Sequence, residues 1–278
     1  MLIRGLLAVL FVSMVGCGDG ADLPDDANDT ASDMQEITVN SLAALEWANG
    51  WIGEVKAQPS RLLENEYTAS STTLTRMSSG VKAKNRNVCG TLVTQLFQNS
   101  VGFNSDDFYH SFNKAMDGTC DVGTVDGKQK GTNSPNASQY RYKIANCGGT
   151  GPIKFTRRDT IGAVRAGDVL AVSYPERTDI TGHVMIVRSA PVADKKLPAG
   201  PSGSTAYAVQ IIDSTSTPHG SAAAYPDWRG GSTGQGMGSG TFVLYADSKG
   251  LIVASRWSAT DPHLSRTSTD RLAIGGLR

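Results

Sequence analysis

Apolar residues recur at helical spacing along the first half of the chain. Three amphipathic helices are therefore expected. They cover residues 40–56, 87–98 and 105–116. Asn40 or Ser41 would cap the first helix and Asn87 the second, because a short polar side chain at that position accepts a hydrogen bond from the first turn. The residues of the third helix that are expected to face the core are Phe108, Phe112 and Met116.

The second half of the chain changes to short β-prone runs separated by turn residues. Strands are expected at each of these runs. They cover residues 168–174, 183–189, 206–213, 241–247 and 251–258. A Pro- and Gly-rich stretch at 189–205 is expected to be a hairpin insertion between the second and third of them. Helices that come first and strands that follow indicate an α+β fold, with N-terminal helices packed on a small antiparallel sheet.

Three stretches lack such periodicity. Residues 58–84 are polar and irregular, and residues 117–151, rich in Gly, Asn, Ser and Lys, are expected to form a long loop. The run GGSTGQGMGSG at 230–240 resembles a phosphate-binding loop in composition. It lacks the GK[ST] ending and precedes a strand, so we expect a turn or a loop that lines a cleft.

The N-terminus has the pattern of an export signal. Arg4 is followed by an apolar run over residues 5–16, which is shorter than the roughly 20 residues needed to span a bilayer. Cys17 follows directly, in a context that resembles a bacterial lipobox. We therefore expect residues 1–16 to be a lipoprotein signal peptide and Cys17 to be lipidated, which would anchor the protein in the cell envelope, facing the periplasm or the exterior. A plain signal peptide cleaved nearby is the alternative.

The residues after this leader are acidic and include Pro24. Residues 17–36 are therefore expected to be a flexible tether, and residues 37–278 a single folded domain. The formal net charge of the chain is zero. This balance offers no electrostatic footprint for nucleic acid, so no nucleic-acid partner is expected, and we expect a monomer.

The cysteines raise a question about pairing. Exported proteins lie where disulfides form, and three cysteines remain once Cys17 is lipidated. Cys120 and Cys147 lie in loop-like sequence, and a bond between them would close a loop of roughly 27 residues, worth about 3 kcal/mol. The odd thiol is then Cys89, and a free thiol in an exported protein requires a reason.

Cys89 lies in the first turn of an expected helix. The free N–H groups and the dipole at this end favour negative charge, so they lower the pKa of a thiol and help to hold an oxyanion. A nucleophile also needs a base. Of the four histidines, His183 is the best candidate because it opens an apolar strand beside Gly182, which permits close approach. A histidine that closes a turn is the alternative.

Asp213 ends the apolar strand over residues 206–213. If that strand pairs with the strand of His183, the carboxylate can reach the ring nitrogen that does not face Cys89. The alternative for Asp213 is a turn-forming residue. Residues in a first turn or at a strand end are expected to contribute little to the core. Because no group of residues has the spacing of a metal site, neither a metal nor an organic cofactor is expected.

Three motifs follow one another in an order that resembles the NlpC-type papain-like cysteine peptidases. They are NVCGTLVTQLF at 87–97, RAGDVLAVSY at 165–174 and TGHVMIV at 181–187. The resemblance covers residues 85–215 and implies a papain-like fold. It also implies cleavage of amide bonds in peptidoglycan stem peptides, with Cys89 as nucleophile, His183 as base and Asp213 as the residue that orients the base.

The chain departs from the pattern of that family at three positions. Val88 and Gly90 flank the cysteine where the family commonly has Asp and Ser, and Met185 stands where glycine is usual. The related CHAP-type amidases share the fold. Two further functions stay open at this point: a non-catalytic envelope module that binds peptide or glycan in the same cleft, and acyl transfer to an amine.

Overall fold

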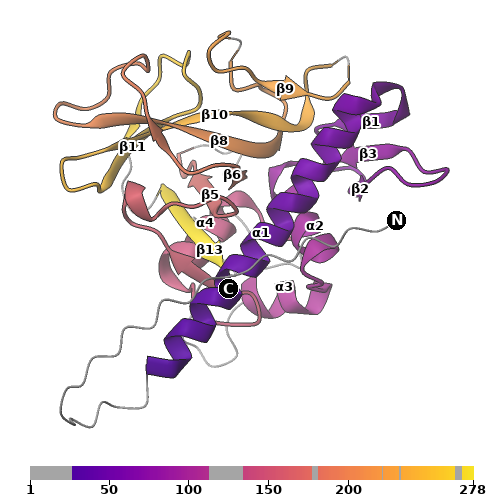
Figure 1. Cartoon of the computed structure of the whole chain (residues 1–278), viewed down its shortest axis with the longest axis horizontal. Coiled ribbons are helices and arrows are strands. Elements are labelled where there is room, and N and C mark those ends of the chain that lie inside the picture. Colours follow the sequence, from indigo (N-terminus) through magenta and orange to yellow (C-terminus); the bar gives the residue numbers. More distant parts are fainter. Residues whose placement is uncertain (1–26, 113–133, 177–180, 221, 232, 267–270) are drawn as a thin grey trace, which may run out of the picture.

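The computed structural model describes residues 27–112, 134–176, 181–220, 222–231, 233–266 and 271–278. These residues form a mixed α+β fold, which confirms the expected class. The helices gather on one side of a large sheet, as Figure 1 shows. They are α1 (Ala27–Ala57), α2 (Cys89–Ser100), α3 (Ser105–Phe112) and α4 (Ala137–Asn146).

The large sheet has ten strands, and the order along its main path is β12-β11-β10-β8-β6-β5-β13-β4. Its pairs are antiparallel throughout, with β7 added to β8 and β9 added to β10. The bounds are β4 (Phe155–Arg157), β5 (Val169–Ser173), β6 (Gly182–Val187), β7 (Val192–Ala193), β8 (Thr205–Thr215), β9 (Trp228–Arg229), β10 (Gly236–Ala246), β11 (Ile252–Arg256), β12 (Ser265–Arg266) and β13 (Leu272–Leu277). The five strands expected from the sequence correspond to β5, β6, β8, β10 and β11.

Each face of the sheet carries a core of its own. On the helix side, Val184 and Ile186 of β6 pack with the apolar face of α2. On the other side, Met185 and Val187 of the same strand pack with residues of β8 and β10. Alternation of side chains along a strand produces this division. The α2 residues that form its buried stripe are Leu92, Val93, Leu96 and Phe97.

The cap expected at α2 is wrong. Val88, not Asn87, is the N-cap residue, and no side chain caps the helix. The amide of Asn87 donates instead to the carbonyl oxygen of Thr73 and to the side chain of Gln95. The bond from Nδ2 of Asn87 to Thr73 ties the start of α2 to the strands before it.

Those strands form a small separate sheet that the sequence pattern did not reveal. In it, β1 (Leu62–Glu66) pairs in parallel with β3 (Ala83–Arg86), and β2 (Thr73–Thr75) pairs with β3 antiparallel. The residues of β1 and β3 are mostly polar because only alternate positions face the protein. The expectation of irregular chain over 58–84 is therefore wrong.

Two helices also differ from expectation. The first begins at Ala27, inside the expected tether, and not at Asn40 or Ser41; half of the residues at 27–36 (Ala, Met, Gln and Glu) are good helix formers, and the acidic composition concealed them. Part of the expected long loop at 117–151 is α4, which starts at a capping box formed by Asn136 and Gln139. In α3, Phe108 and Phe112 are buried as expected, and Met116 lies outside the described residues.

Three further expectations concern the glycine-rich run, membrane-spanning segments and the N-terminus. The run at 230–240 is not wholly a loop, because Gly236 already begins β10. Within the described part of the chain, no helix is both long and apolar enough to cross a membrane. Residues 1–26, with the expected signal peptide and Cys17, lie outside the described residues.

Candidate active site

The site forms where the pairing of two neighbouring strands stops. Strands β6 and β8 pair only through Ile186 with Ile212 and Val187 with Ile211. His183 lies on β6 and Asp213 on β8, just past these pairs. Helix α2 packs against both strands, and a hydrogen bond from Ser214 of β8 to the backbone oxygen of Asn87 holds the approach to α2 here. The pairing on which the expected contact between His183 and Asp213 depends is therefore present, and it brings both side chains toward the start of α2.

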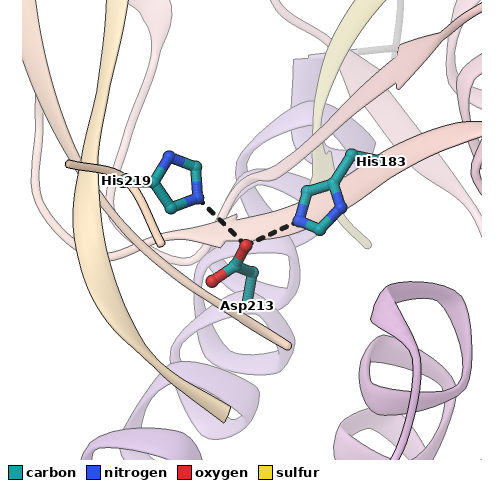
Figure 2. Close-up of side chains that lie close together, drawn as sticks. All are labelled: His183, Asp213 and His219. Carbon is teal, nitrogen blue, oxygen red and sulfur yellow. Dashed lines mark hydrogen bonds and ion pairs between the residues drawn. The ribbon is translucent and has the colours of Figure 1, made fainter. Parts of the chain in front are cut away.

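His183 and Asp213 are directly hydrogen-bonded. Nε2 of His183 lies 2.6 Å from Oδ2 of Asp213, as Figure 2 shows. The His183 side chain is nearly buried and that of Asp213 is fully buried. Because Nε2 faces the carboxylate, Nδ1 is the ring nitrogen left for a second partner. A carboxylate that holds one nitrogen of an imidazole fixes both its orientation and its tautomer.

The second partner of His183 is Cys89, whose thiol lies within hydrogen-bonding reach of the ring. Burial works to raise the pKa of Cys89, but the charge and hydrogen bond of His183 and the backbone N–H of Val184 lower it overall. Burial alone would lower the pKa of His183, whereas Cys89 and Asp213 raise it to about 10. Shifts in these opposite directions favour a thiolate–imidazolium pair.

Asp213 has more partners than the sequence suggested. Its Oδ1 accepts a hydrogen bond from Nη1 of Arg229 at 2.6 Å, and its Oδ2 also accepts from Nε2 of His219 at 3.0 Å. Burial works to raise the pKa of Asp213, but Arg229 and the two histidines hold it well below its usual range. Asp213 is therefore an ionised carboxylate at the centre of a buried charge cluster, not a turn residue.

His219 and Trp257 complete the wall of the site. Trp257 stacks on His219, with ring centroids 3.9 Å apart, and meets His183 edge-on at 4.8 Å. Its backbone oxygen also lies 2.5 Å from Nδ1 of His219. His219, Arg229 and Trp257 were not among the residues expected at the site. Two of them lie in short loop-like stretches, and their proximity depends on how β8, β10 and β11 are ordered in the sheet.

Tyr67 was missed as well. It follows β1, is partly exposed, and its hydroxyl lies within hydrogen-bonding reach of Cys89. Burial, followed by the negative charges of Cys89 and Asp213, raises the pKa of the phenol. The hydroxyl therefore keeps its proton and can donate to the thiolate.

The glycine that follows Cys89 has a steric explanation. A Cβ at Gly90 would lie 2.6 Å from the carbonyl oxygen of Pro135, so even a serine would displace the chain that leads into α4. Met185, the other departure from the family pattern, is fully buried in the core on the far face of the sheet.

The other cysteines are only partly described. Cys89 is the free cysteine of the described residues, and Cys147 is disulfide-bonded. Cys120, the expected partner of Cys147, lies outside the described residues, as does Cys17. The Cys120–Cys147 bond and the lipidation of Cys17 therefore stay predictions.

His183, Asp213 and His219 also form a group whose nitrogen and oxygen atoms lie within 4.8 Å of one another. Such a group could in principle bind a metal ion. However, Arg229 lies 2.6 Å from Asp213, and both histidines direct Nε2 at the same carboxylate oxygen. A guanidinium in contact with a prospective ligand repels a cation, so the cluster fits ion pairing better than metal binding.

No family model matches the chain, and no solved structure matches it. The chain is similar to "Uncharacterized protein R653" of Acanthamoeba polyphaga mimivirus, with 34% identity over 114 residues. The match covers 37% of this chain and 48% of the viral protein, so the chain spans about half the length of that relative.

Proposed function

We propose that the protein is a cysteine hydrolase that cleaves amide bonds. The observation that carries this proposal is the order of three contacting side chains: Cys89 at a helix N-terminus, His183 beside it, and buried Asp213 2.6 Å behind the ring. A helix that presents the nucleophile to an antiparallel sheet bearing the base supports a papain-like arrangement. Thiolate, base and orienting carboxylate are the groups that covalent catalysis by cysteine requires.

The reaction follows from the protonation states at the site. The Cys89 thiolate attacks the amide carbonyl carbon, and first-turn N–H groups of α2 stabilise the oxyanion that forms. His183 then gives its proton from Nδ1 to the leaving amine. Water, deprotonated by the neutral imidazole, attacks the acyl-enzyme, and the thiolate leaves with the imidazolium restored. Asp213 keeps Nε2 protonated throughout.

Peptidoglycan stem peptides are the substrate class we propose, because of the three motifs that resemble NlpC-type peptidases. The test is incubation of the purified full chain with muropeptides and peptide amides, followed by mass spectrometry of the products. Cleavage should disappear in Cys89→Ala and His183→Ala and persist in His263→Ala, which changes an exposed histidine outside the site. Products joined to an added amine would instead assign acyl transfer, and no cleavage by wild type would contradict the proposal.

We also propose that Cys17 is lipidated and holds the enzyme at the cell envelope. The support is its position directly after the apolar run of residues 5–16. Growth with labelled palmitate should label wild type and leave Cys17→Ser unlabelled. Equal labelling of both would contradict the proposal and leave the hydrolase proposal untouched.

A further inference from the structure

His219 has an oxygen acceptor at each of its two ring nitrogens. Nδ1 lies 2.5 Å from the backbone oxygen of Trp257, and Nε2 lies 3.0 Å from Oδ2 of Asp213. A backbone carbonyl can only accept a hydrogen bond, and so can an ionised carboxylate. Both ring nitrogens of His219 must therefore donate, which requires the doubly protonated, cationic imidazolium. Figure 2 shows the two histidines directed at the same carboxylate oxygen from opposite sides.

We propose that His219 is a cationic positioning residue that, together with Arg229, sets the pH range in which the Cys89–His183 pair reacts. The inference rests on the proposed function of that pair. It assigns His219 no contact with substrate: His219 acts through Asp213, which touches His183 in turn.

The charges around His219 balance only if it is protonated. Arg229 contacts Asp213 and, with two further bonds of 2.8 and 2.9 Å, Asp227. Asp227 also accepts the backbone N–H of His219 at 2.8 Å. Two buried carboxylates thus face one guanidinium, and a cationic His219 supplies the second positive charge. Among the described residues beyond Asp213, the titratable groups around the pair are His183, Cys89, Tyr67 and Tyr140; thiolate and imidazolium cancel, and both phenols are neutral.

The surrounding residues are shaped to hold this ring. A Cβ at Gly240 would lie 2.7 Å from both Cβ of His219 and Oδ2 of Asp227, so the strand carries no side chain where His219 lies. Trp257 covers the other side of the ring by stacking. The His219 side chain is completely buried. Two hydrogen-bond acceptors and a stacked aromatic ring thus surround the buried imidazole, and both features stabilise a positive charge on it.

The positive charge of His219 acts on both members of the reactive pair. It opposes the imidazolium of His183, whose ring centroid is 6.4 Å away, and more weakly favours the thiolate of Cys89. Removing it should raise the pH at which His183 loses its proton and, by less, the pH at which Cys89 forms thiolate. At that separation and an effective dielectric constant near 20, the larger shift is about one to two pH units.

The first experiment compares His219→Gln with wild type, using the full chain purified in detergent. Glutamine keeps an amide N–H for Asp213 but has no charge. The readouts are the rate of Cys89 alkylation by iodoacetamide and the rate of peptide cleavage, each across pH. We expect both profiles to move to higher pH in His219→Gln and to stay in place in the control His263→Gln. A purely structural His219 would lower the melting temperature without moving either profile, and that result would overturn the proposal.

The second experiment uses the wild-type protein, so it does not depend on whether a variant folds. Nitrogen-15 labelling of histidine gives few signals, since the chain has four histidines. We expect His219 to show two ring N–H protons at neutral pH, and a single one would overturn the proposal. The outcomes separate from those of the proposed function: if wild-type Cys89 alkylates with the profile of an ordinary thiol, the hydrolase proposal fails whatever the state of His219.

Discussion

Ser214 and Asn87 join the two halves of the candidate site. The Oγ of Ser214, directly after Asp213 on β8, donates to the backbone oxygen of Asn87 at 2.6 Å. Asn87 lies two residues before Cys89, at the approach to α2. Both groups are fully buried. One hydrogen bond therefore fixes the spacing between the nucleophile's helix and the strand that orients the base.

Ser214→Ala should weaken both stability and turnover. The Asn87 oxygen would remain buried without this donor, so we expect the free energy of unfolding to fall by about 1–3 kcal/mol. The start of α2 would also move relative to Asp213, so kcat should fall more than KM rises. Chemical denaturation and steady-state kinetics measure these effects. Ser248→Ala, in an exposed turn, is the control, and equal behaviour of the two variants would show that this bond positions nothing.

Local sequence patterns predict the helices and strands that are determined by neighbouring residues in the chain. The apolar stripe of α2 and the β-prone runs of β6 and β8 depend on residues close in sequence. The sequence therefore indicated on which elements Cys89, His183 and Asp213 lie, whereas the pairing of β6 with β8 was a condition that the structure meets. Cys89, His183 and Asp213 lie on α2, β6 and β8, and local motifs were enough to infer the order of these three elements along the chain.

The rest of the site depends on contacts between distant segments. His219 and Arg229 reach Asp213 because β8 lies beside β10 and β9 beside β10 in the sheet. No periodicity indicates those positions, and Tyr67 lies on a connection after a strand that was itself missed. The glycines of the run at 230–240 have a steric role that composition does not indicate: Gly238 and Gly240 leave room for Arg229 and His219.

Asp213→Ala should destabilise the protein far more than Cys89→Ala. A strand-end residue was expected to matter little for stability, but Asp213 is fully buried and pairs with Arg229 and His219. Its removal leaves buried positive charge unpaired, which costs about 3–5 kcal/mol. Cys89→Ala removes one sulfur from a first turn, and we expect a loss near 1 kcal/mol. Melting curves of both variants measure the difference, and similar melting temperatures would contradict the ion-pair cluster.

Tyr67→Phe should slow the reaction without unfolding the protein. The phenol hydroxyl lies within hydrogen-bonding reach of Cys89, and a bond to a charged group is worth about 1.5–3 kcal/mol. Losing it should raise the pKa of the thiol and lower kcat by about tenfold or more. The measurement is turnover together with the pH dependence of Cys89 alkylation. Tyr109→Phe, at an exposed position on α3, should change neither.

The dependence of turnover on pH should follow the two coupled groups. The lowered pKa of Cys89 means that thiolate is present below the ordinary thiol range. The pKa of His183 is raised to about 10, so the imidazolium that protonates the leaving amine persists until the pH rises through that value. Peptide cleavage should therefore decline near pH 10 while alkylation of Cys89 continues, because alkylation needs no proton donor. Parallel decline of both rates would contradict this assignment.

Gly240→Ala tests whether the room left by the strand β10 serves the charge cluster. The added methyl group would lie 2.7 Å from both His219 and Asp227, closer than side chains tolerate, so His219 must shift away from Asp213. Gly53→Ala is the matched control, since nothing lies within 4 Å of a Cβ at that helical position.

We expect Gly240→Ala to lower the melting temperature and to move the pH profile of cleavage upward, as His219→Gln does, because both separate the same charge from Asp213. Gly53→Ala should leave the profile unchanged and stabilise α1 slightly, by about 0.5–1 kcal/mol. Combining Gly240→Ala with His219→Gln should add little further shift, since the two changes remove one interaction. Full additivity of the two pH shifts would mean that Gly240 acts on the site by another route.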